Sequence, residues 1–105
     1  MTSEQFKELN KRISGIHDFL KIDQKKLELN EQELKTHDPD FWNDPKGAET
    51  QMKLIRGIKF WVTSFEEIQG RLDDLGVLQD FVKEGISTPE ELNLTYHKLT
   101  ESVEN

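Results

Sequence analysis

Hydrophobic residues recur every seven positions over the first third of the chain. A second, shorter row starts at Leu9 and Ile16 and continues with the polar residues Asp23 and Asn30. The first row contains Phe6, Ile13, Leu20, Leu27 and Leu34. Spacings that alternate between three and four residues place one narrow apolar stripe on a long helix, as in coiled coils and antiparallel hairpins. The pattern predicts one helix over residues 3–36, with a capping box between Thr2 and Gln5.

The polar positions in the second row allow two interpretations. The apolar stripe can narrow at Asp23 and Asn30 because the helix diverges from its partner there. Alternatively, one of these side chains is buried and fixes the register of the packed helices.

A matching heptad pattern covers the middle of the chain and predicts a second helix over residues 45–84. Its first row contains Leu54, Trp61, Ile68, Leu75 and Val82. Its second row contains Ile58, Phe65 and Leu72. Two long helices with matching stripes bury them best against each other, so we expect an antiparallel hairpin. Gly70 and Gly76 make a bend or a break possible in the second helix.

A third helix is predicted over residues 88–104. Gly85 is suited to the position after a helix, and Thr88 and Pro89 are suited to the cap and first position of the next one. These patterns together predict an all-α fold, an elongated three-helix bundle built on a long antiparallel helical hairpin. We expect residues 1–105 to form a single helical domain. Because the last apolar stripe has no stop signal, we also expect the natural protein to continue past Asn105.

Two prolines separate the first two helices, and each follows an aspartate. Asp38 precedes Pro39 and Asp44 precedes Pro45, which suits a capping carboxylate followed by proline at the first helical position. Between them, Trp42 is expected to fold back over the end of the hairpin and close its core. The alternative is that Trp42 is an exposed anchor for a partner protein.

Composition and charge restrict the possible partners. The chain has no cysteine and a net charge of -7, and no run of 18 apolar residues occurs. We therefore expect a cytoplasmic protein with no membrane span and no disulfides. Because affinity for phosphate backbones comes from cationic side chains, we expect no independent nucleic-acid binding.

The residues that carry enzyme chemistry are sparse. His17, His37 and His97 show no paired metal-ligand spacing, and the adjacent acids in the helices point in different directions. No glycine-rich phosphate loop or nucleophile motif occurs. We expect no catalytic residues, no metal and no cofactor in this chain.

The turn also carries a family resemblance. The residues Asp38, Pro39, Trp42, Asn43 and Pro45 form a Pro-x-x-Trp-Asn-x-Pro turn between two heptad-patterned helices. This segment, with the preceding residues 20–26, resembles the N-terminal domain of the bacterial peptide chain release factor 2 family. The members of that family are class I release factors. The resemblance is strongest over residues 16–86.

The resemblance implies a role in translation termination, in which the full-length protein reads stop codons and triggers peptide release. The chain lacks the Gly-Gly-Gln and Ser-Pro-Phe motifs of those two activities, so neither is assigned to a residue here. It implies instead a docking module that reaches the ribosomal stalk base and the release-factor GTPase. We expect this chain to be monomeric. The alternative is a self-associating coiled-coil adaptor or chaperone-like hairpin.

Overall fold

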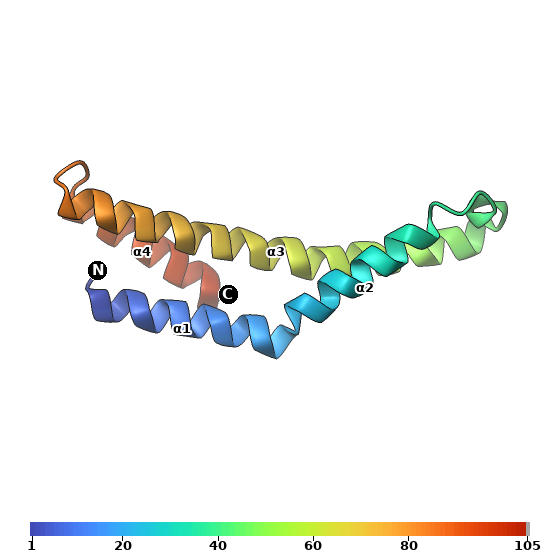
Figure 1. The fold of residues 1–105 in the computed structure, drawn as a ribbon, viewed down its shortest axis with the longest axis horizontal. Helices are drawn as coiled ribbons and strands as arrows, with labels where there is room; N and C mark the ends of the chain where they lie inside the picture. Colours follow the sequence, from blue (N-terminus) through green and yellow to red (C-terminus); the bar gives the residue numbers. More distant parts are fainter. Residues whose placement is uncertain (105) are drawn as a thin grey trace. The chain divides into compact units, whose positions relative to one another are not determined.

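The computed structural model describes residues 1–104, which form four α-helices and one short 3₁₀ turn (Figure 1). The elements are α1 (Ser3–Leu20), α2 (Ile22–Lys35), η1 (Phe41–Asn43), α3 (Pro45–Lys83) and α4 (Pro89–Glu104). No strand occurs within this described range, so the all-α prediction is confirmed. The predicted number of helices is wrong, because the expected helix over residues 3–36 is divided at Lys21.

Lys21 divides the first helix because its backbone is left-handed. Its φ of 54° and ψ of 51° interrupt the helix, and the ammonium of Lys25 donates to the carbonyl oxygen of Leu20 at the break. A left-handed residue other than glycine costs about 1–2 kcal/mol. The break is accompanied by complete burial of Ile22, which contributes about 1.5–3 kcal/mol and offsets that cost.

The same break explains why part of the predicted apolar row is not in the core. Ile13, before Lys21, is fully buried as predicted. Leu27 and Leu34, after Lys21, are 67% and 56% exposed. The left-handed residue rotates the helix, so that α2 buries Ile22 in place of the row that began in α1.

α3 is one continuous helix of 39 residues and has no break at Gly70 or Gly76. Gly76 has a packing role instead. A Cβ atom built there would lie 3.2 Å from Cζ of Phe6, so the missing side chain makes room for the Phe6 ring. Gly15 of α1 has no comparable packing role, because a Cβ atom built there would meet no atom within 4 Å.

The contacts divide the described chain into two compact units. We call Met1–Phe19 with the residues from Glu66 onward the three-helix unit, because it contains α1, the end of α3 and α4. We call Leu20–Phe65 the two-helix unit, because it contains α2 and the beginning of α3. The expectation that the chain forms a single domain stays a prediction.

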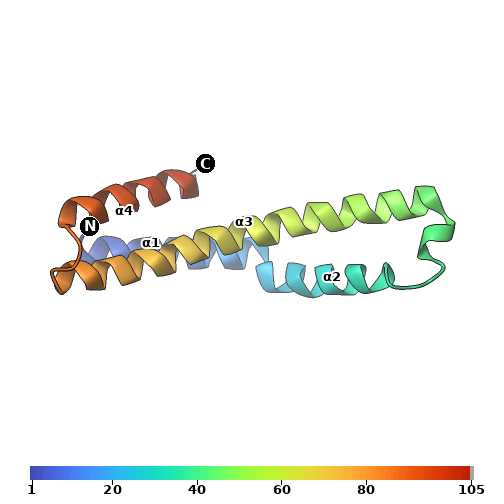
Figure 2. The ribbon, with the colours of Figure 1, turned by 90° about the horizontal axis from the view of Figure 1, so that it is seen from above.

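The three-helix unit has a core to which all three of its helices contribute. α1 and α4 both lie alongside the C-terminal part of α3 (Figure 2). The buried residues are Leu9, Ile13, Leu72, Leu75, Leu92 and Leu99. At the periphery, Arg71 donates to the hydroxyl of Ser102 at 2.7 Å and Arg12 pairs with Glu104 at 3.7 Å.

The two-helix unit is an antiparallel hairpin, as the heptad patterns predict. α2 runs beside the first part of α3, and the turn that contains η1 connects them (Figure 2). Its buried residues are Ile22, Ala48, Ile55, Val62 and Phe65. The side-chain amide of Gln51 donates to that of Gln32 across the two helices. Two helices cover less of each other than three do, so much apolar surface of this unit remains exposed.

Candidate functional site

The motif residues at the tip of the two-helix unit are organised by short-range hydrogen bonds. The Asp38 carboxylate accepts the backbone N–H of Asp40 at 2.9 Å, and the Asp40 carboxylate accepts the side-chain amide of Asn43 at 3.2 Å. Pro39 lies between the two aspartates. Side chains that bond to nearby backbone or to each other stabilise turns. Asp38 and Asn43 are therefore determinants of the turn in this structure.

Asp44 and Pro45 occupy the positions predicted for them at the start of α3. Pro45 is the first helical residue, and the Ala48 N–H donates to the Asp44 carbonyl at 2.9 Å. The Asp44 carboxylate lies over this first turn, since a Cβ at Gly47 would be only 2.5 Å from its Oδ2. An anionic group at a helix N-terminus interacts favourably with the helix dipole. Gly47 makes room for it.

Trp42 does not close the core, and that prediction is wrong. It is 61% exposed and packs edge to face on Phe41, with ring centroids 4.8 Å apart. Phe41 is the more buried of the pair and lines a small pocket with Lys35, Ala48 and others at the end of the hairpin. The 3₁₀ turn directs the first aromatic ring toward the helices and leaves the second one in solvent.

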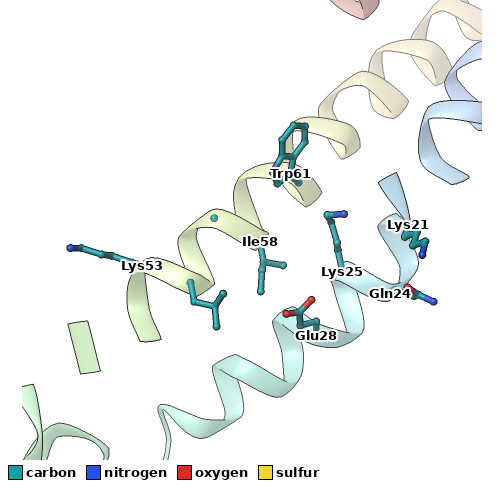
Figure 3. A pocket seen from close by; sticks show the side chains of 9 residues that line it. Lys21, Gln24, Lys25, Glu28, Lys53, Ile58 and Trp61 are labelled. Carbon is teal, nitrogen blue, oxygen red and sulfur yellow. The ribbon is translucent and has the colours of Figure 1, made fainter. Parts of the chain in front are cut away.

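A larger groove lies along one side of the two-helix unit, between α2 and α3 (Figure 3). Its volume is about 460 Å³. α2 contributes polar residues to it, which are Lys21, Gln24, Lys25 and Glu28. α3 contributes Lys53, Leu54, Gly57, Ile58 and Trp61, most of them apolar or small. The groove thus has two lysines on its α2 side and an apolar wall on α3, and the ammonium of Lys53 pairs with the Glu49 carboxylate at 3.3 Å.

The side chains of the groove differ in how they are directed. In Figure 3, Lys25 and Glu28 extend from α2 toward α3, Ile58 extends toward α2, and Lys53 points away from α2. Trp61 and Leu54 are 47% and 45% exposed, although the heptad pattern places both in the core. A Cβ at Gly57 would meet no atom within 4 Å, so this position leaves the groove open.

Charge is distributed unequally between the two units. The two-helix unit has eight basic and eight acidic residues, whereas the three-helix unit with the chain end has six basic and thirteen acidic ones. The whole net charge of -7 therefore belongs to the three-helix unit. Residues 51–65 of α3 contain Lys53, Arg56 and Lys59 and no acidic residue. The groove lies in the most basic region of the chain.

Metal and membrane sites are not evident in the part of the chain that the structure describes. Within residues 1–104, no group of three or more His, Cys, Asp or Glu side chains is arranged to hold a metal ion. No helix in this range is long and apolar enough to cross a membrane.

The structure thus defines an all-α protein with a two-helix hairpin, a motif-bearing turn at its tip and a lysine-lined groove. The chain is similar to peptide chain release factor 2 of several bacteria. It is 31% identical to that of Acidothermus cellulolyticus over 75 residues, which is 71% of this chain and 20% of the relative. It is 31% identical to that of Nitratiruptor sp. over 96 residues, which is 91% of this chain and 26% of the relative.

A third relative extends the similarity to nearly the whole chain. Peptide chain release factor 2 of Rhodococcus jostii is 24% identical over 102 residues, or 96% of this chain and 28% of the relative. A match of that length includes both units and the turn. These relatives confirm the resemblance predicted from the turn, and the chain is homologous to a segment of the release factor 2 family.

The chain spans about a fifth to somewhat more than a quarter of the length of these relatives. No family model matches it, and no solved structure matches it.

Proposed function

We propose that the chain is the N-terminal helical domain of a peptide chain release factor that acts in translation termination. The similarity to release factor 2 over 71–96% of the chain carries this proposal. The coverage of only 20–28% of each relative supports one domain of a larger protein. The cytoplasm, where ribosomes work, is the compartment that this role requires.

We infer that the role of this domain is docking and positioning, not chemistry. The sequence has no Gly-Gly-Gln, and the motif residues Asp38 and Asn43 are used to build the turn. The partners of the domain are the stalk base of the large ribosomal subunit and the release-factor GTPase. Its net charge of -7 opposes independent binding to RNA, which favours protein surfaces as the direct contacts.

Mass spectrometry of the protein isolated from its own cells tests this assignment. We expect peptides that continue beyond Asn105 in the same polypeptide and that include a Gly-Gly-Gln sequence. A cellular protein that ends at Asn105 would contradict the assignment to a release factor.

The rival function is a self-associating adaptor, and one observation favours it. Leu27 and Leu34 are seven residues apart on α2, and both are exposed. A parallel or antiparallel pair of such helices could bury them between two copies. Sedimentation of the 105-residue chain over a wide concentration range decides between the two functions. We expect a monomer throughout, whereas a stable dimer dispersed by Leu27→Glu would favour the adaptor.

A further inference from the structure

We propose that the groove of the two-helix unit binds an acidic amphipathic helix of a partner protein. The groove is lined by Lys21, Lys25 and Lys53 around the apolar residues of α3. The proposal rests on the groove alone and holds whether or not the chain acts in termination.

The two units of the chain show what the groove lacks. In the three-helix unit, α4 buries Leu92 and Leu99 and completes a shared core. α4 carries four glutamates and one lysine. The two-helix unit, Leu20–Phe65, contains two α-helical segments, α2 and the beginning of α3. A partner helix in its groove would complete a three-helix arrangement with the same kind of acidic, amphipathic element.

The spacing of the apolar residues fits a helix better than an extended peptide. Leu54, Ile58 and Trp61 occupy positions i, i+4 and i+7 of α3, so they lie in one row along the groove. Helices that bind in grooves present their own apolar anchors at the same spacing. A half-exposed tryptophan in such a row is the type of residue that dominates binding energy at interfaces.

The charge of the groove favours an acidic partner. Lys21 and Lys25 line the α2 side of the groove against one acidic residue, Glu28, whereas the ammonium of Lys53 pairs with the Glu49 carboxylate at 3.3 Å. On the other side, α3 has no acidic residue between positions 51 and 65. An acidic helix gains favourable electrostatics there and a basic helix does not. The rest of the chain is acidic, so binding of an acidic partner is directed to this groove.

A protein helix fits the groove better than a nucleic acid does. Leu54 and Ile58 offer an aliphatic surface that rewards apolar side chains. Strong phosphate binding requires many cationic contacts, and the two-helix unit as a whole has no net positive charge.

The test uses the 105-residue chain with the substitution Trp42→Phe, which leaves Trp61 as the only tryptophan. The probe is a synthetic helix of about 18 residues with leucines at i, i+4 and i+7 and glutamates on its other faces. A second probe has lysine in place of every glutamate. We expect saturable binding of the acidic probe with a blue shift of Trp61 emission, and binding of the basic probe that is roughly tenfold weaker.

Two pairs of variants locate the binding site. Gly57→Leu fills the groove, and Gly70→Leu is its control on the same helix, because a Cβ at either position meets no atom within 4 Å. Lys21→Glu reverses a charge of the groove, and Lys59→Glu reverses a charge of the same unit that does not line the groove. Thermal melts followed by circular dichroism verify that each variant folds. We expect Gly57→Leu and Lys21→Glu to weaken binding of the acidic probe roughly tenfold, and we expect the two controls to leave it within about twofold.

Several results would overturn the proposal. Equal binding of both probes would show that charge does not select the partner. Equal effects of Gly57→Leu and Gly70→Leu would place the binding site elsewhere. Tighter binding of a single-stranded RNA oligonucleotide than of the acidic probe would make the groove a nucleic-acid site. A dimer of the chain that is dispersed by Gly57→Leu would make a second copy the occupant.

Discussion

Replacing Lys21 with glycine tests the division of the first predicted helix into α1 and α2. Lys21 has a φ of 54°, and its side chain is exposed. Glycine adopts this conformation without the cost of about 1–2 kcal/mol that a side chain imposes. Glycine also makes the unfolded chain more flexible, which removes about 0.4–1 kcal/mol. The gain from the relieved backbone exceeds the loss from the more flexible unfolded chain, so Lys21→Gly should raise the free energy of unfolding by about 0.5–1 kcal/mol.

A continuous helix over residues 3–36 would give the opposite sign. Glycine inside a regular helix costs about 1 kcal/mol, which is what we expect for the control Lys11→Gly in the middle of α1. For a domain of this size, 1 kcal/mol corresponds to about 4–8 °C in melting temperature. Lys21→Gly should therefore melt about 2–8 °C above the parent chain, and Lys11→Gly about 4–8 °C below it.

Urea unfolding followed by circular dichroism measures both free energies directly. Lys21→Val provides a third point, because a β-branched residue tolerates the left-handed region poorly and should lower stability. If Lys21→Gly destabilises the chain as much as Lys11→Gly does, residue 21 is helical and the assigned break is wrong.

Three further predictions concern packing and caps, and thermal or urea unfolding checks each. Leu75→Ala should lower the free energy of unfolding by about 2–5 kcal/mol, because Leu75 is fully buried. Trp42→Ala should lower it by about 1 kcal/mol, because Trp42 is mostly exposed. Equal losses for the two variants would contradict the structure of the turn. Gly47→Ala should stabilise the chain by about 1 kcal/mol through helix propensity when Asp44 is also replaced by alanine, and by less than that in the parent chain, where the Asp44 carboxylate has to move aside; additive effects of the two substitutions would contradict the contact. Thr88→Ala should cost about 1 kcal/mol because the hydroxyl caps α4, and no change would show that the cap is not formed.

Local signals at the helix ends were read correctly from the sequence. The capping box between Thr2 and Gln5 is formed in both directions, with hydrogen bonds of 2.8 and 3.1 Å. Gly85 has a φ of 76° after α3, and the next N–H, of Ile86, donates to the carbonyl of Phe81 at 2.8 Å. These features depend on residues a few positions apart, so their spacing along the chain is sufficient to predict them.

The break at Lys21 could not be predicted in this way. Neither glycine nor proline occurs between residues 16 and 38, and lysine is a good helix former. The break accompanies the burial of Ile22, which depends on packing between distant segments. The heptad row is correct as far as Ile13 and wrong at Leu27, because one left-handed residue changes the face of every residue after it.

The groove was missed for a related reason. Its residues come from two segments about 30 positions apart, and each of its lysines resembles an ordinary surface residue when read alone. Trp61 lies in a regular heptad row, yet it is half exposed. The heptad row of the first predicted helix does not cover it, because the left-handed Lys21 changes the face that α2 buries. The absence of acidic residues between positions 51 and 65 is the one signal in the sequence that points to this surface.

Docking without chemistry is the role proposed for this chain, and the kinetics of the full-length protein test it most directly. Peptide release is measured from ribosomes stalled at a stop codon, as a function of the concentration of the release factor. The full-length factor is compared with a deletion variant that lacks residues 1–105. Deletion should raise the half-saturating concentration roughly tenfold and leave the rate at saturation within about twofold. A deletion that leaves the half-saturating concentration unchanged, or that abolishes release at saturation, would contradict a docking role.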